Sequence, residues 1–157
     1  MSHVIERGAL LPSVRLHAAS NGTPTDLRAG AGARVVLVAH SADCAACRRF
    51  VRDFAPTSRE IAEWGGRTLV VVPGDRDAAA AFVAPAEGIE VLADSDSRLG
   101  VTGALVAVAD EWGEIFATFD IDETHDFPSG PELLEWTRFI TIQCPECEGP
   151  EGEWRTL

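Results

Sequence analysis

All four cysteines of this 157-residue chain fall in two C-x-x-C pairs, Cys44/Cys47 and Cys144/Cys147. Thiols at this spacing support two kinds of chemistry, thiol–disulfide exchange and metal binding by thiolates. Exported disulfide scaffolds instead scatter their cysteines through shorter chains. The pattern therefore predicts redox exchange or metal binding, with inert buried pairs as the alternative.

The first pair directly follows a continuous apolar run at residues 34–39, which predicts a central strand buried on both faces. Apolar residues at helical spacing then extend from about residue 45 to 64. Cys44 is thus expected at a helix N-terminus, where backbone N–H groups and the helix dipole favour the thiolate, and Arg48 can add to this. Cys47 lies one turn further on the same face, close enough to form a disulfide. A redox pair, a metal site and an inert pair all stay open.

The other predicted elements alternate between strands and helices. Two short strands precede the central one, and a hairpin with a turn at residues 110–113 precedes the last helix. Pro56 is expected to kink or split the first helix. The last helix is expected to begin at Pro131 and to bury Leu133, Trp136, Phe139 and Ile140 on one face. The order predicts an α/β fold with right-handed crossovers, as one domain at 1–143 and a short acidic tail at 144–157.

Residues 8–119 resemble the thioredoxin-like superfamily on its peroxiredoxin side. The matching segments, in the family's order, are residues 11–16, Asn21-Gly22, Leu27, 35–39, 44–47, 99–101 and 105–115. The resemblance implies a thioredoxin-like fold, a central mixed sheet flanked by helices, with extra N-terminal strands. It also implies that Cys44 is the attacking thiol and Cys47 the resolving thiol. Ser41 matches the Thr or Ser that peroxiredoxins carry three residues before their reactive cysteine.

The chain departs from the family pattern at three places. Leu37 stands where peroxiredoxins have a proline, seven residues before the reactive cysteine, and no arginine lies near Ala104, where that family carries one. Thioredoxins have a cis-proline near the same position. Because a cis bond without proline costs about 3 kcal/mol, we expect a trans peptide bond at Ala104 or Leu105.

The second pair, Cys144/Cys147, comes after the last helix. Zinc ribbons separate their two C-x-x-C pairs by about 15–20 residues, whereas most of the fold separates these. In a thioredoxin fold, a last helix of about a dozen residues would carry Cys144 roughly 20 Å from the first site. The options are a second redox pair, a metal site shared between chains, or a local disulfide that ties the tail down. A redox-capable pair is preferred over a metal site or an inert pair. A homodimer is among the expected assemblies, because a partner subunit could supply the second pair to the first site.

Two histidines are further candidate functional residues. His40 ends the central strand and could act as a base, although a local hydrogen bond is the simpler interpretation. His125 lies among Asp120, Asp122, Glu123 and Asp126. That cluster could bind a cation through oxygen ligands, but it lacks EF-hand spacing, so a solvated acidic loop is the preferred interpretation.

The formal net charge is -12 and the pI about 4.6, which disfavours nucleic acid and anionic membrane as partners. All 13 basic residues are arginine, which excludes lysine chemistry. Charges interrupt the apolar stretches of the first 20 residues, so no signal peptide is predicted and a cytoplasmic location is expected. No cofactor is expected, and no metal is assigned to the first pair.

The predicted function is thiol–disulfide oxidoreduction by Cys44 and Cys47, with a disulfide-bearing protein or small thiol as substrate and a cellular reductant. Two alternatives stay open. One is a thiol peroxidase that uses Cys44 and Ser41. The other is a non-catalytic thioredoxin-like module whose cysteine pairs are inert or metal-bound.

Overall fold

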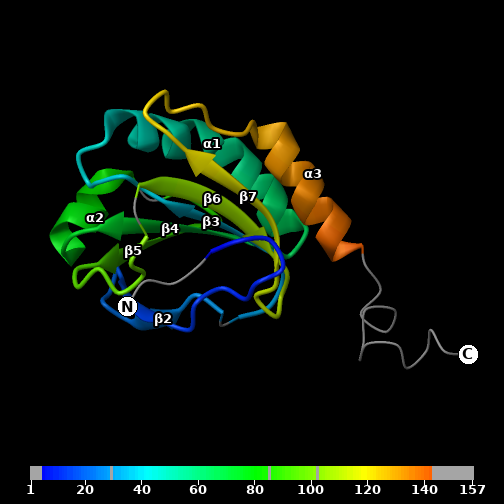
Figure 1. Cartoon of the computed structure of the whole chain (residues 1–157), viewed down its shortest axis with the longest axis horizontal. Coiled ribbons are helices and arrows are strands. Elements are labelled where there is room, and N and C mark those ends of the chain that lie inside the picture. The colour runs from blue at the N-terminus through cyan, green and yellow to red at the C-terminus, as the bar shows by residue number, and fades with distance from the viewer. Residues whose placement is uncertain (1–4, 29, 85, 102, 143–157) are drawn as a thin grey trace, which may run out of the picture.

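The computed structural model describes residues 5–28, 30–84, 86–101 and 103–142. In that part of the chain, seven strands form one sheet in the order β2-β1-β5-β4-β3-β6-β7 (Figure 1). The strands are β1 (Arg15–Ala18), β2 (Pro24–Asp26), β3 (Arg34–Val38), β4 (Arg67–Pro73), β5 (Ile89–Asp94), β6 (Ala104–Ala109) and β7 (Ile115–Ile121). The mixed sheet confirms the predicted α/β fold.

The centre of the sheet is buried on both faces. All five residues of β3 are buried, and its side chains alternate between two apolar clusters. Val35 and Leu37 pack into one cluster with residues of all three helices. Val36 and Val38 pack into a second cluster, which the N-terminal residues Leu11, Leu16 and Leu27 help to form. Coverage on both faces explains why the run at 34–39 is apolar throughout.

Among the described residues, three helices pack on the sheet: α1 (Ala45–Glu63), α2 (Arg76–Phe82) and α3 (Gly130–Thr141). The helices α1 and α3 lie against each other, as Figure 1 shows. Asp75 caps α2 by accepting a hydrogen bond from the backbone N–H of Ala78 at 2.8 Å. None of the helices in the described residues has the length and apolar character that crossing a bilayer requires.

Two sequence-based expectations about the helices need correction. Of the two effects expected of Pro56, a kink or a split, the split does not occur, because α1 continues through the proline as one element whose apolar face packs on the core on both sides of it. In α3, Phe139 is 48% exposed, and Leu134 takes a buried place that the sequence analysis missed. The buried face of α3 consists of Leu133, Leu134, Thr137 and Ile140.

The hairpin formed by β6 and β7 sets the direction of the strands beside β3. The strand β6 is antiparallel to β3, and β7 is antiparallel to β6, so β7 runs parallel to β3. Val38 pairs with Leu105, which in turn pairs with Asp120. The carboxyl ends of β3 and β7 therefore lie at the same edge of the sheet. The described peptide bonds are all trans, as expected at Ala104 and Leu105.

Candidate active site

Cys44 occupies the N-cap position of α1, at the edge of the sheet where β3 ends. Its φ and ψ of -68° and 104° are extended, so the chain turns into the helix at this residue. Its Sγ accepts a hydrogen bond from the backbone N–H of Cys47 at 3.3 Å. A sulfur placed here satisfies one of the free N–H groups of the first helical turn, and this contact favours negative charge on the sulfur. The Cys44 side chain is half-buried.

Cys47 lies directly behind Cys44 and is fully buried, with 0% of its surface exposed. Burial, followed by the hydrogen bond with Cys44, raises the pKa of the Cys47 thiol to about 12. Both residues are free thiols in this structure. The two sulfurs thus differ in the way a dithiol exchange centre requires, with one reachable sulfur and one protonated sulfur held in reserve.

Two histidines complete the site. The Nε2 of His125 lies 3.4 Å from the Sγ of Cys44. The Nδ1 of His40 lies 3.6 Å from the Sγ of Cys47 and 4.0 Å from the Sγ of Cys44. The two imidazole rings meet edge to face, with their centroids 4.8 Å apart. The four ligand-type atoms of these side chains all lie within 4.8 Å of one another.

The loop after β7 holds His125 in place. His125 has a φ of 54°, in the left-handed region that few residues other than glycine adopt. Its N–H donates to the Asp122 carbonyl at 3.0 Å, and its Nδ1 lies 3.0 Å from the Glu123 carbonyl oxygen. The Thr124 hydroxyl and amide both donate to the Asp122 carboxylate, which lowers the pKa of Asp122. These contacts fix the direction in which the imidazole points.

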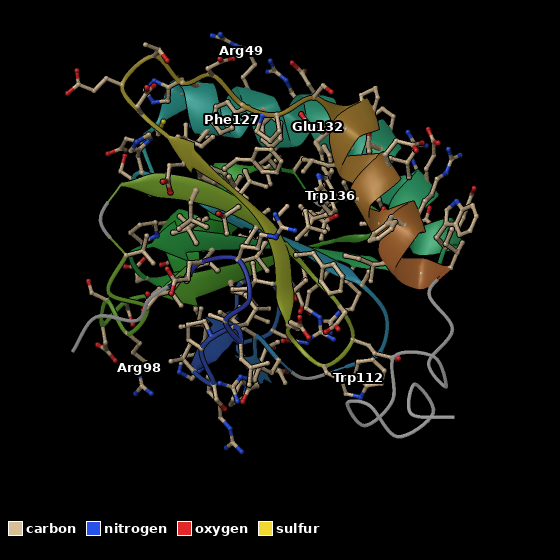
Figure 2. All side chains as sticks on the ribbon, turned by 45° about the vertical axis from the view of Figure 1, so that its right-hand side comes forward. Arg49, Arg98, Trp112, Phe127, Glu132 and Trp136 are labelled. Carbon is tan, nitrogen blue, oxygen red and sulfur yellow. The ribbon has the colours of Figure 1, made fainter. Side chains whose placement is uncertain are left out.

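Aromatic stacking anchors the same loop to α1. The ring of Phe127 stacks on Phe50 with centroids 4.4 Å apart and an 8° angle between the ring planes. Figure 2 shows Phe127 on the segment that passes over α1 before it reaches α3. Because Phe50 stands six residues after Cys44 on the same helix, this stack ties the position of His125 to that of the cysteine.

Two other predicted site residues, Arg48 and Ser41, lie near Cys44 in sequence and make different contacts. The Arg48 guanidinium donates to the carbonyls of Phe82 and Ala81 at the end of α2, at 2.9 and 3.1 Å. Ser41 is exposed and meets Cys44 through its backbone, since its carbonyl accepts the Cys44 N–H at 3.3 Å. Cys144 and Cys147 lie outside the described residues.

His125 is the residue whose role the sequence analysis missed. As predicted, the acidic residues around it are exposed: Asp122, Glu123 and Asp126 lie in the loop, and Asp120 lies at the end of β7. The histidine among them points to the cysteines instead. The available signal was topological: a hairpin beside β3 places the end of its second strand at the edge where β3 ends.

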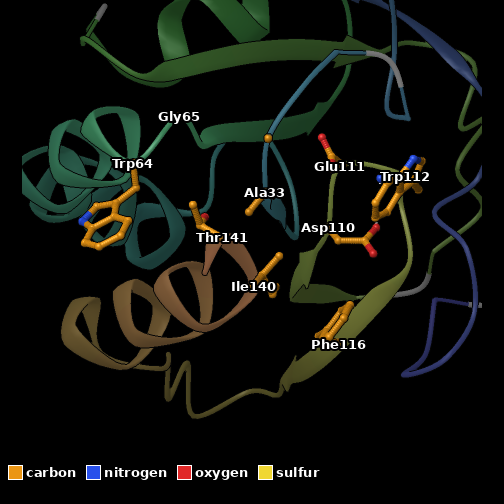
Figure 3. A pocket seen from close by; sticks show the side chains of 10 residues that line it. Ala33, Trp64, Gly65, Asp110, Glu111, Trp112, Phe116, Ile140 and Thr141 are labelled. Atoms are coloured by element: carbon orange, nitrogen blue, oxygen red, sulfur yellow. Dashed lines mark hydrogen bonds between the residues drawn. The ribbon is translucent and has the colours of Figure 1, made fainter. Parts of the chain in front are cut away.

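A separate hollow of about 310 Å³ lies at the opposite end of the sheet (Figure 3). The start of β3, the end of α1 and the end of α3 contribute to it, and Trp64 and Trp112 border it. Asp110 belongs to its lining, but the Asp110 carboxylate accepts hydrogen bonds from the N–H groups of Trp112 and Glu114 in the hairpin turn. The Asp110 carboxylate therefore holds the hairpin turn, and the residues that line the hollow do not include the cysteines and histidines of the candidate active site.

Comparison with solved structures identifies the architecture. A yeast mitochondrial 1-Cys peroxiredoxin superposes with a TM-score of 0.75 at 12% sequence identity, covering 93% of this chain and 80% of that chain. The chain has the thioredoxin-like fold of the peroxiredoxins. AhpC of Mycobacterium bovis gives a TM-score of 0.74 at 16% identity over 90% of this chain and 97% of that chain. Peroxidoxin BcpB of Mycobacterium tuberculosis gives 0.70 at 17% identity over 90% and 100%.

This peroxiredoxin fold confirms the architecture that the sequence resemblance implied. No protein-family model matches the sequence, and no curated protein matches it. The chemistry must therefore be argued from the site itself.

Proposed function

We propose that this protein is a thiol–disulfide oxidoreductase in which Cys44 attacks and Cys47 resolves. The observation that supports this proposal is the asymmetry of the pair. Cys44 is half-buried at the start of α1, with the backbone N–H of Cys47 and the Nε2 of His125 near its sulfur, whereas Cys47 is fully buried with a pKa raised to about 12. An inert cysteine pair would not require this difference in burial between its two thiols, nor a histidine from a distant loop beside one of them.

The proposed reaction proceeds in two displacement steps. The Cys44 thiolate attacks one sulfur of a substrate disulfide, which forms a mixed disulfide and releases the other substrate sulfur as a thiolate. Cys47 then loses its proton and attacks the Cys44 sulfur. The mixed disulfide breaks, the second substrate thiolate leaves, and the Cys44–Cys47 disulfide forms. Two electrons have passed from the protein dithiol to the substrate.

The two histidines take different roles in these steps. A protonated His125 donates from Nε2 to the Cys44 thiolate, and its Nδ1–H donates to the Glu123 carbonyl. The Nδ1 of His40, 3.6 Å from the Cys47 sulfur, is placed to accept the proton that this buried thiol must lose before it attacks. We propose His125 as the residue that stabilises the nucleophile and His40 as the base for the resolving step.

The test is reduction of insulin disulfides with a regenerating chemical reductant. Cys44→Ser should abolish turnover, and Cys47→Ser should accumulate a mixed disulfide that mass spectrometry detects. His125→Asn should slow the attack by about tenfold or more, the value of one charge-assisted hydrogen bond of about 1.5–3 kcal/mol. His17→Asn, whose ring bonds the Gly22 carbonyl, is the matched control. Unchanged turnover in Cys44→Ser would disprove the proposal.

A thiol peroxidase is the second candidate, and the fold shared with peroxiredoxins favours it. In this reaction the Cys44 thiolate attacks one peroxide oxygen, an alcohol or water leaves, and Cys47 resolves the sulfenic acid as water departs. Rapid loss of micromolar peroxide, with a sulfenic acid trapped on Cys44 in Cys47→Ser, would favour this reaction.

Both candidates use thiol reductants. A homodimer in solution is also part of the proposal, to be checked by light scattering. A cytoplasmic location is likewise proposed, to be checked by cell fractionation.

A further inference from the structure

We propose that His40, Cys44, Cys47 and His125 form a zinc site in the reduced protein, with two sulfur and two nitrogen ligands. Reduced thiols would bind the metal, and the Cys44–Cys47 disulfide would release it. This inference does not depend on the proposed oxidoreductase activity, since it concerns what the reduced site binds. It departs from the sequence-based assignment, which placed no metal at this pair.

The distances between the ligand atoms fit a tetrahedral zinc ion. With Zn–S of about 2.3 Å and Zn–N of about 2.0–2.1 Å, tetrahedral ligand atoms lie about 3.4–3.8 Å apart. The structure has 3.4 Å between His125 Nε2 and Cys44 Sγ, and 3.6 Å between His40 Nδ1 and Cys47 Sγ. A further sulfur–nitrogen distance, from His40 to Cys44, is 4.0 Å. All four ligand atoms lie within 4.8 Å of one another, so the widest pair would close by at most about 1 Å on metal binding.

The chemistry of the donors selects the metal class. Two thiolates and two imidazoles in a tetrahedral arrangement suit zinc, whereas calcium and magnesium prefer oxygen ligands. The acidic side chains of the neighbouring loop are exposed, so they do not compete for the same place. His125 is also oriented as metal-binding histidines are, with its other ring nitrogen 3.0 Å from the Glu123 carbonyl. That contact assigns the proton to Nδ1 and leaves the Nε2 lone pair for the metal.

Solvent can reach the proposed zinc site, and metal binding there is coupled to the loss of thiol protons. His40, Cys44 and His125 are each partly exposed, while Cys47 closes the inner side. Binding releases one proton from each cysteine that is a thiol, so zinc affinity should rise with pH by up to about tenfold per unit for each proton released. When a disulfide compound accepts two electrons from the dithiolate, the protein disulfide forms, two external thiolates leave and Zn²⁺ is freed. Bound zinc should slow attack by Cys44, because the thiolate is then a metal ligand.

The experiment measures metal binding to the whole chain carrying Cys144→Ser and Cys147→Ser, so that the first pair supplies the only thiols. The reduced protein, free of any histidine tag, is titrated with Co²⁺, followed by Zn²⁺ competition against a chromophoric chelator. We expect one metal per chain and the visible absorption of tetrahedral cobalt with thiolate ligands. Zinc affinity should fall by more than about 100-fold, beyond the loss typical of an outer-shell partner, in His40→Asn and in His125→Asn. His17→Asn should bind as the parent does.

A second comparison needs no ligand substitution. The same protein, oxidised to the Cys44–Cys47 disulfide, should bind no zinc, and thermal unfolding with a chelator present checks that every variant is folded. Equal zinc binding by the reduced and oxidised forms would overturn the proposal. So would unchanged affinity in both histidine variants, since the dithiol alone would then hold the ion. Insulin reduction measured with a chelator present reports on the proposed activity separately, so either proposal can fail without the other.

Discussion

The burial of Cys47 predicts a large difference in reactivity between two thiols that are only three residues apart. At pH 7, a thiol with a pKa of about 12 is about 10⁻⁵ thiolate. An ordinary cysteine with a pKa of about 8.5 is about 3% thiolate at the same pH. The population of the reactive form alone therefore slows alkylation of Cys47 by about 3,000-fold relative to free cysteine, and its lack of exposed surface slows it further.

The composition makes this measurement direct. The chain contains no tyrosine and no lysine, so cysteine thiols are the main side chains that titrate between pH 8 and 11. Two single-thiol proteins are compared in a background with Cys144→Ser and Cys147→Ser, one with Cys47→Ser and one with Cys44→Ser. Iodoacetamide labelling is followed by mass spectrometry, and thiolate formation by ultraviolet absorbance, which has no tyrosinate contribution here.

The protein that retains Cys47 should label at least about 1,000-fold more slowly than free cysteine at pH 7. Its rate should still rise with pH at pH 10. A rate within tenfold of the Cys44 protein would refute the reasoning, because it would show that Cys47 is neither sealed nor held as a thiol. Labelling in denaturant is the control, since the two proteins should then react alike.

Three further predictions concern stability, each measured by urea denaturation. The Cys47 thiol has a pKa of about 12 in the folded state and about 8.5 in the unfolded state. Its contribution to the free energy of unfolding should therefore be fully present below pH 8.5 and fall by about 2–3 kcal/mol by pH 10.5. Cys47→Ala should flatten this decline, and an equal decline in that variant would show that Cys47 is not its cause. Asp110→Ala removes a buried acceptor of two hairpin N–H groups and should cost about 2–4 kcal/mol, with Asp110→Asn costing less. Gly32→Ala should cost about 2–4 kcal/mol, because its φ is +84° and a Cβ would lie 1.9 Å from the Gly65 carbonyl oxygen; Gly8→Ala, with φ +89° and no atom within 4 Å, should cost only about 1–2 kcal/mol.

The sequence predicted the elements whose residues carry a local signal. The apolar run before Cys44 and the turn before Glu114 were sufficient to place β3 and the hairpin. The cysteine at the helix start also followed from local pattern, since the strand must end before the helix begins. Phe139 was misjudged, and the split considered at Pro56 does not occur, because packing against distant elements outweighs local preference at these positions.

The histidine side of the site could not be predicted in this way. His125 reaches Cys44 across 81 residues, through the pairing of three strands and one aromatic stack. The acidic residues around it dominate the local pattern and correctly indicate a solvated loop. The relative direction of β3 and β7 brings that loop to the edge where β3 ends, and the contact with Cys44 shows that the His125 side chain faces the sulfur.

The long separation between Cys44 and His125 has a consequence for biosynthesis. A ribosome adding about 5–20 residues per second needs roughly 4–16 s to extend the chain from one to the other. During that interval the nascent polypeptide carries both thiols and His40 but lacks His125, whose imidazole lies beside Cys44 in the folded chain. The site is therefore complete only after synthesis has passed residue 125. A polypeptide that ends after β7 would contain both cysteines without His125.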